Sequence, residues 1–162
     1  MRSDDFERLF AEHAGPLLAF LSYRTSDRAL AEELVGETFE RALRARRRFD
    51  RRKASEKTWL YSIALNCVRD HARRRQAEHR AYQRAPDLSP VPSAGELLDA
   101  IDDRDSVARA LQALSVEERE AIALRFGAEL TVPEIAKLTR EKLTTVEGRV
   151  YRALRKLRAE LE

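Results

Sequence analysis

Hydrophobic residues recur every three or four positions along most of the chain, which is the period of an amphipathic α-helix. This spacing predicts helices over about residues 4–23, 27–46 and 55–80. Gly15-Pro16 should bend or interrupt the first helix, because proline cannot donate a helical hydrogen bond. Strand-type alternation is nearly absent, so the pattern predicts an all-α fold. The inward positions expected on the second and third helices are Leu30, Leu34, Val35, Phe39, Ala42 and Leu43, then Leu60, Ile63, Ala64, Cys67, Val68 and His71.

The last third of the chain begins two short helices with the same start signal. Glu118 follows Ser115 by three residues, and Glu134 follows Thr131 by three, a spacing in which each pair caps a helix reciprocally. A longer helix is predicted over about residues 144–161. A short helix, a tight turn and a second, basic helix form a helix-turn-helix, whose second helix enters the major groove of DNA. We expect Val146, Val150, Leu154, Leu157 and Leu161 on its inner face, and Thr145, Arg149, Arg152 and Lys156 on its outer face.

A segment rich in proline and serine divides the chain into two parts. Residues 85–96 contain three of the five prolines, which is typical of an extended, semi-flexible linker. We therefore predict two small helical domains: a three-helix domain over residues 1–84 and a four-helix domain over residues 97–162.

The distribution of charge is more informative than its sum. Charged residues make up 36% of the chain, but the net charge is only +3. Basic residues gather in three runs, over residues 41–53, residues 69–84 and the C-terminal helix, whereas acidic residues concentrate between Asp87 and Glu120. Clusters of this kind indicate a polyanionic partner. For any single run, the alternative is an ordinary solvated helix face.

Several classes of protein are disfavoured by what the sequence lacks. A single cysteine excludes an internal disulfide and a multi-cysteine zinc site, and we interpret Cys67 as a core residue rather than a redox switch. There is no signal peptide and no apolar run near 18 residues, so we expect a cytoplasmic protein that does not enter a membrane. No phosphate-binding loop or nucleophile motif is present, so we expect neither an enzyme nor a cofactor. The acids that a nuclease would need for a metal have no histidine nearby; they are Asp99, Asp102, Asp103 and Asp105.

Three motifs occur in the order found in one protein family. The second predicted helix contains the run from Ala31 to Phe39, and the third contains Trp59-Leu-Tyr-Ser-Ile-Ala-Leu-Asn66, followed by Asp70 and Arg73-Arg-Arg75. With the helix-turn-helix, they resemble the extracytoplasmic-function (ECF) type of bacterial sigma factor over nearly the whole chain. The resemblance implies a region 2 domain, a linker and a region 4 domain. It also implies a transcription initiation factor that binds core RNA polymerase and directs promoter recognition and −10 melting.

The resemblance also implies roles for individual residues. The second helix would dock on the clamp helices of the polymerase β′ subunit, and region 4 on the β flap. The third helix and the loop before it would read and melt the −10 element, and the helix-turn-helix would read the −35 element. The residues matched to polymerase docking are Glu32, Glu33, Leu34, Glu37 and Phe39; those matched to the −10 element are Arg51, Arg52, Lys53, Asn66, Arg69, Arg73 and Arg74; those matched to the −35 element are Lys142, Thr144, Thr145, Arg149 and Arg152.

The side chains suit these roles chemically. Asn66 offers a donor and an acceptor to an extruded base, arginines can follow phosphates, and Arg149 could read guanine. The sequence departs from the family at Gly36, where glutamine is usual, and in the helix-turn-helix. There the family often has glycine at Arg140 and Thr144, serine at Lys142, and a basic residue at Glu147.

The resemblance finally implies partners. They are core RNA polymerase, promoter DNA and an anti-sigma factor that holds the chain inactive, with the free chain a monomer. The alternative is a free-standing helix-turn-helix regulator that dimerises on a palindromic operator. Such a regulator would have no need of Trp59, Asn66 and the arginines that follow on the third helix.

Overall fold

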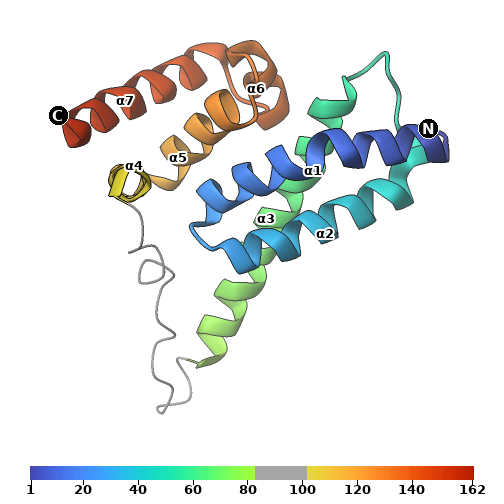
Figure 1. Cartoon of the computed structure of the whole chain (residues 1–162), viewed down its shortest axis with the longest axis horizontal. Coiled ribbons are helices and arrows are strands. Elements are labelled where there is room, and N and C mark those ends of the chain that lie inside the picture. The colour runs from blue at the N-terminus through green and yellow to red at the C-terminus, as the bar shows by residue number, and fades with distance from the viewer. Residues whose placement is uncertain (83–101) are drawn as a thin grey trace.

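The computed structural model describes residues 1–82 and 102–162, with the side chains of residues 102–105 left out (Figure 1). Within these ranges all regular structure is helical and no strand occurs, which confirms the predicted all-α fold. The predicted linker, the start of the second domain and Asp99 lie outside the described residues. The helices are α1 (Ser3–Thr25), α2 (Arg28–Ala45), α3 (Glu56–Tyr82), α4 (Asp102–Gln112), α5 (Val116–Ile122), α6 (Val132–Thr139) and α7 (Leu143–Leu161), with a 3-10 turn η1 (Arg46–Arg48) and a π-helical turn η3 (Ala123–Gly127).

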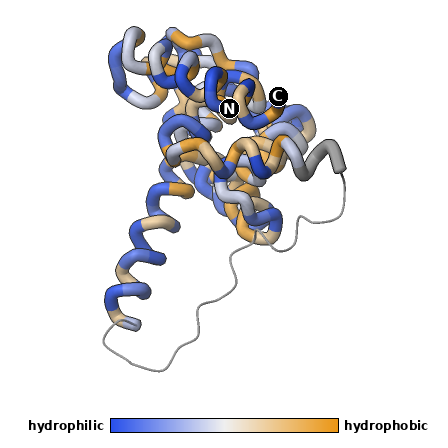
Figure 2. Tube along the Cα trace, turned by 90° about the vertical axis from the view of Figure 1, so that its left-hand side faces the viewer, coloured by the Kyte–Doolittle hydropathy of each residue, from blue (hydrophilic) through white to orange (hydrophobic). Residues whose placement is uncertain are grey.

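Helices α1, α2 and α3 form the N-terminal body. Its core includes Leu9, Phe20 and Leu34, all buried, and Cys67 is buried among them, which confirms its predicted core position. Asp27 begins α2 by accepting a hydrogen bond from the Leu30 backbone N–H at 3.1 Å. Beyond His71 every residue of α3 is exposed, and Figure 2 shows this hydrophilic end standing clear of the rest of the molecule.

Helix α1 is continuous through Gly15 and Pro16, so of the two predicted outcomes, a bend or an interruption, the interruption does not occur. Proline inside a helix costs about 3 kcal/mol, partly because its ring clashes with the Cβ of the preceding residue. Here that residue is Gly15, which has no Cβ. Burial of Leu17, Phe20 and Leu21 in the following turn offsets the remainder of the cost.

Helices α4 to α7, with η3, form the C-terminal body. Both predicted helix starts are confirmed: Ser115 caps α5 reciprocally with Glu118, and Thr131 caps α6 reciprocally with Glu134. Arg140 ends α6 in the left-handed conformation, with φ 58°, at the position where the family often has glycine. A side chain there costs about 1–2 kcal/mol.

The inner face of α7 differs from the predicted one at its C-terminal end. Val146 and Val150 are buried as predicted, and Ala153 is buried with them. Leu154 and Leu161 are instead 41% and 52% exposed, because the buried stripe follows 3.6 residues per turn along Ala153 and the half-buried Leu157.

Candidate nucleic-acid interface

The outward face of α3 presents Asn66 and Arg69. Asn66 is exposed although Leu65 and Cys67, its neighbours in sequence, are buried, so its amide points away from the core as predicted. Arg69 lies one turn further along and is also exposed. An amide and a guanidinium on one solvent-facing stripe can hydrogen-bond a base edge and a phosphate.

The loop before α3 holds three basic side chains at the surface. Asp50 fixes its turn, because its carbonyl accepts from the Lys53 N–H at 3.0 Å and its side chain accepts from the Arg52 N–H at 2.9 Å. Arg51, Arg52 and Lys53 are all exposed, and Arg51 pairs with Glu56 at 3.2 Å. The loop thus carries positive charge on a backbone held by local hydrogen bonds.

The loop is also tied to α3 by an aromatic contact. The rings of Phe49 and Trp59 lie with their centroids 4.9 Å apart. Trp59 is partly buried against the core, so it can act as an anchor for this loop. The contact sets where the basic loop stands relative to the first turns of α3.

Arg73 and Arg74, further along α3, belong to a network of charges shared with α2. Arg41 donates to Asp70 at 2.8 Å and also to Glu37, while Arg74 approaches Glu37 to 3.7 Å and Arg73 approaches Asp70 to 3.7 Å. The hydrogen bond from Arg41 lowers the pKa of Asp70. Glu37, which was predicted to contact polymerase, and Arg74, which was predicted to contact DNA, therefore form an ion pair with each other.

Arg41 was not among the predicted site residues, although it connects them. It lies one helical turn after Glu37, the i to i+4 spacing of acid and base that supports helix surfaces. This spacing is the feature of the sequence that could have identified Arg41 as a partner of Glu37. The four side chains Arg41, Asp70, Arg73 and Arg74 line a surface hollow of about 400 Å³.

Only part of the predicted polymerase-docking set is at the surface. Glu32 and Glu33 are exposed, whereas Leu34 and Phe39 are 1% and 6% exposed and pack in the core, where Phe39 meets the ring of Phe10 at 4.8 Å. Leu34 and Phe39 are therefore too buried to contact a partner directly, and any such contact from α2 must be made by its exposed side chains. The exposed positions along the same face of α2 are Glu32, Glu33, Gly36, Glu40 and Leu43.

Arg149 on α7 forms an ion pair with Glu141 in the turn of the helix-turn-helix. Both guanidinium Nη atoms of Arg149 donate to Glu141 in the turn, each at 2.8 Å, and the Arg149 side chain is only 18% exposed. This hydrogen bonding lowers the pKa of Glu141 and raises that of Arg149. Lys156 similarly pairs with the buried Glu118 at 2.9 Å. Two of the four residues predicted on the outer face are thus engaged within their own body.

Other side chains of α7 and its start remain open to solvent. Directly opposite the buried stripe lie the exposed residues Thr144, Tyr151 and Arg155, with the half-buried Gly148 between them. Tyr151 is 65% exposed, which is unusual for an aromatic side chain in the middle of a helix. The predicted readers that stay exposed are Lys142, Thr144, Thr145 and Arg152.

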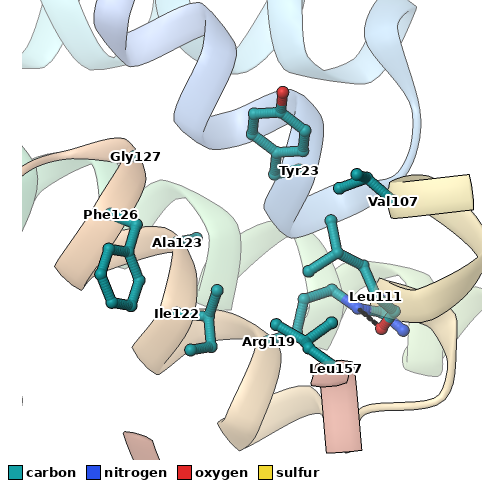
Figure 3. Close-up of a pocket in the computed structure, with 9 residues that line it drawn as sticks. All are labelled: Tyr23, Val107, Leu111, Arg119, Ile122, Ala123, Phe126, Gly127 and Leu157. Atoms are coloured by element: carbon teal, nitrogen blue, oxygen red, sulfur yellow. Dashed lines mark hydrogen bonds between the residues drawn. The ribbon is translucent and has the colours of Figure 1, made fainter. Parts of the chain in front are cut away.

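An apolar pocket of about 350 Å³ lies where α1 meets the C-terminal body (Figure 3). Tyr23 approaches it from α1, and Leu111, Ile122 and Phe126 approach from α4, α5 and η3. Arg119 lines the pocket with its Nε atom donating to the Leu111 carbonyl at 3.1 Å. Burial lowers the pKa of Arg119, and the charge of Arg24 lowers it further.

The described residues contain no group of three or more His, Cys, Asp or Glu side chains placed to hold a metal ion. None of their helices has both the length and the apolar character that crossing a membrane requires. The side chains of Asp102, Asp103 and Asp105 are not among those that the structure describes.

Comparison with known families gives two matches, one in each body. The model of sigma-70 region 2 matches residues 9–78, and the model of sigma-70 region 4 matches residues 104–157. Both matches follow the order that the sequence motifs indicated.

Several similar proteins of known function are described as RNA polymerase sigma factors. The RNA polymerase sigma factor CarQ of Myxococcus xanthus is 35% identical over 96% of this chain and 88% of its own length. The ECF RNA polymerase sigma factor SigL of Mycobacterium tuberculosis (strain ATCC 25618 / H37Rv) is 31% identical over 95% of this chain and 87% of its own. The chain spans only 60% of the length of another relative, the ECF RNA polymerase sigma factor BldN of Streptomyces coelicolor, at 29% identity.

Two solved structures have similar folds. The sigma factor RpoE from Bartonella quintana, solved with the anti-sigma factor NepR, superposes with a TM-score of 0.81 at 25% identity, covering 98% of this chain and 97% of that one. CnrH, solved with the cytosolic domain of CnrY, gives a TM-score of 0.70 at 28% identity, covering 99% and 89%.

Proposed function

This chain belongs to the ECF-type sigma factors of the sigma-70 family, and we propose that it binds core RNA polymerase and places its two bodies on the −10 and −35 elements of a promoter. Its role is therefore transcription initiation. The proposed activity is binding and strand separation without catalysis by the chain itself, in the cytoplasm, where the polymerase works.

The observation that carries the −10 role is the outward face of α3. Asn66 and Arg69 stand exposed on a helix whose other side is core, and Arg52 and Lys53 lie on the loop before it. An extruded base needs hydrogen-bonding groups at its edge, and the strand needs cations along its phosphates. Asn66 supplies the first and the basic residues the second. Arg51, Arg73 and Arg74 would join them by exchanging their carboxylate partners for phosphate.

For the −35 role, the contacts within the helix-turn-helix favour a revised set of readers. Arg149 serves to fix the turn to α7 through Glu141 rather than to read guanine. The groove-facing side chains we propose are Thr144, Tyr151 and Arg152, flanked by Lys142 and Thr145. Arginine at position 152 can donate two hydrogen bonds to guanine, and it lies beside Gly148, where a Cβ would be 3.3 Å from one of its Nη atoms.

Polymerase docking is assigned to the exposed stripe of α2. Glu32, Glu33 and Glu40 make this stripe acidic and Leu43 gives it an apolar edge, which suits a basic partner helix such as a β′ clamp helix. Leu34 and Phe39 contribute by holding the stripe in place from inside. Region 4 is proposed to dock on the β flap.

An anti-sigma factor is proposed as the partner that keeps the chain inactive. The support is that RpoE and CnrH, which share this fold, were solved in complexes, RpoE with the anti-sigma factor NepR and CnrH with the cytosolic domain of CnrY. Such a partner would cover the polymerase-binding surfaces of the free chain, which we expect to be a monomer.

The first test is transcription with core polymerase on a promoter library, comparing wild type with Asn66→Ala. Asn66 is exposed, so the fold should be unchanged. Loss of a base-edge contact worth about 1–3 kcal/mol should lower transcription roughly 5- to 150-fold and relax −10 specificity. Gln112→Ala, which removes the same kind of amide from an exposed position on α4, is the matched control and should transcribe like wild type.

The same assay separates a sigma factor from the alternative regulator. A sigma factor supports transcription only with core polymerase and binds promoter duplex weakly alone. Tight binding of the isolated chain to a palindromic site, as a dimer and without polymerase, would contradict the proposed function.

A further inference from the structure

Glu147 is an acidic side chain on α7, the helix that is proposed to enter the major groove. It lies at the start of the second turn of this helix and is exposed. Tyr151, one turn later on the same side, is 65% exposed. The phosphates of DNA are negatively charged, so they repel an acid on a helix that binds between them. Glu147 therefore weakens DNA binding unless its carboxylate has a specific partner on the DNA.

No ion pair among the described residues accounts for this carboxylate. In the C-terminal body, the glutamates that do form ion pairs there are Glu118 with Lys156, Glu120 with Arg24, and Glu141 with Arg149. None of the residues three or four positions from Glu147 is basic, so the helix itself offers it no partner. It also lies beyond the first turn, where an acid would stabilise the helix dipole. The Glu147 carboxylate is thus available to accept hydrogen bonds from a ligand.

Arg152 places a cation at nearly the same level of α7. Its guanidinium reaches back along the helix to Gly148, the residue that follows Glu147, because a Cβ there would lie 3.3 Å from one of its Nη atoms. Each residue adds only about 1.5 Å along the axis, so this guanidinium stands close to the level of Glu147. Five residues separate the two positions, which places them about 140° apart around the helix. An acceptor and a set of donors therefore flank the outer face of α7.

These two groups are complementary to the major-groove edge of cytosine paired with guanine. Cytosine presents an amino donor, which a carboxylate accepts, and guanine presents two acceptors, to which a guanidinium donates. Guanine and thymine offer the carboxylate no donor, and adenine places its N7 acceptor beside its amino group. The groove is about 12 Å wide and a helix with its side chains about 10–12 Å, so both flanks of α7 come within reach of base edges.

We propose that Glu147 is a specificity-determining residue that accepts a hydrogen bond from a cytosine amino group in the −35 element. The promoters of this sigma factor then contain cytosine at the −35 position that faces Glu147. This inference rests on the proposed −35 role of α7. Repulsion between the carboxylate and the phosphates weakens binding to every sequence, and only cytosine offsets it. Glu147 thus selects promoters chiefly by rejecting those that lack this cytosine.

The test is transcription by core polymerase with the full-length chain on promoters whose −35 element is randomised and whose −10 element is constant. Wild type should prefer cytosine at one −35 position by at least about fivefold. Glu147→Gln should lose this preference in favour of adenine, because an amide can both donate to N7 and accept from the amino group of adenine. Glu147→Lys should instead favour guanine at the same position, since lysine donates to its acceptors.

Absolute activities separate a change in specificity from a general loss of function. On promoters with the cytosine, Glu147→Gln should transcribe at least about fivefold less than wild type. On promoters without it, the same variant should transcribe more than wild type, because the repulsion of the phosphates is removed. Glu147 is exposed, so thermal unfolding of the variant should match wild type. Glu160→Gln makes the same change at an exposed position near the end of α7 and should keep the wild-type preference.

The possible failures of this inference and of the proposed function give different results. Transcription without a cytosine preference in the −35 element, or with one that Glu147→Gln leaves unchanged, would overturn the role of Glu147 and leave the proposed function standing. Equal losses by Glu147→Gln on all promoters would overturn that role as well. If core polymerase transcribes no promoter of the library with this chain, the proposed function fails, and the role of Glu147 fails with it.

Discussion

At the scale of single residues, the pair of Arg149 and Glu141 shows how a side chain that could read a base can instead be structural. From sequence, a basic residue on the outer face of a recognition helix is a natural reader of guanine. Glu141 lies eight residues earlier, across a turn, and no helical period connects the two. The pairing depends on how α6 and α7 cross, and so it could not be predicted from the sequence pattern.

The pairing predicts non-additive effects on stability. Glu141→Gln and Arg149→Ala should each lower the free energy of unfolding by on the order of 1 kcal/mol, because each leaves a partly buried charged group without its partner. The double variant should cost little more than either single one, which thermal or urea unfolding of all four proteins can measure. Additive losses would mean that the two side chains act independently.

At the scale of helices, the sequence predicted most of the fold because the capping residues and the apolar period of each helix lie within that helix. Ser115 and Thr131 begin helices through reciprocal caps. The apolar period of α2 and α3 identifies their buried faces except at Leu43, which was predicted to point inward but is 42% exposed. The prediction errors arise where packing against other helices, or a neighbouring residue, determines which side chains are buried or whether a helix continues. Leu154 and Leu161 share a heptad-like stripe with Val150, but the helices α4, α5 and α6 that pack against α7 cover Ala153 and Leu157 instead. A bend or an interruption was expected at Pro16, and the interruption is absent because Gly15 removes part of the clash with the proline ring.

The candidate site was less predictable than the fold. Exposure of Asn66 follows from the period of α3 alone. The burial of Leu34 and Phe39 also follows from the period of α2, whereas the resemblance matched both to polymerase docking. The contact of Lys137 with Lys53 brings together residues far apart in the sequence, and only the tertiary structure reveals it.

Two glycines inside helices, Gly36 and Gly15, test whether helix propensity or a clash with the next residue determines the effect of an added side chain. A Cβ added at Gly36 or at Gly15 would meet no other atom within 4 Å. Gly36→Ala should therefore raise the free energy of unfolding by about 1 kcal/mol through helix propensity. Gly15→Ala should give no such gain, because an alanine before Pro16 clashes with the proline ring. Equal stabilisation of both variants, measured by thermal unfolding, would rule out our explanation of the unbroken α1.

At the scale of the whole molecule, acid should weaken the protein through carboxylates in both bodies. Hydrogen bonds from Arg41, Lys156 and Arg149 lower the pKa values of Asp70, Glu118 and Glu141 respectively. The folded state thus favours the charged form of each carboxylate. The resulting stability is fully present above the ordinary pKa values, 3.8 for Asp70 and 4.5 for the two glutamates. It is lost as the pH falls through the lowered values in the folded chain.

Glu118 should be the most informative of the three carboxylates, because it is buried and joins α5 to α7 through Lys156. We expect Glu118→Gln to melt at a lower temperature than wild type at pH 7, and the gap between them to narrow as the pH falls from 5 to 3, where wild type loses the charged pair as well. Glu160→Gln, at an exposed position on α7, serves as the matched control and should follow the wild-type curve. A gap that stays constant down to pH 3 would mean that Glu118 stabilises the C-terminal body by packing rather than by charge.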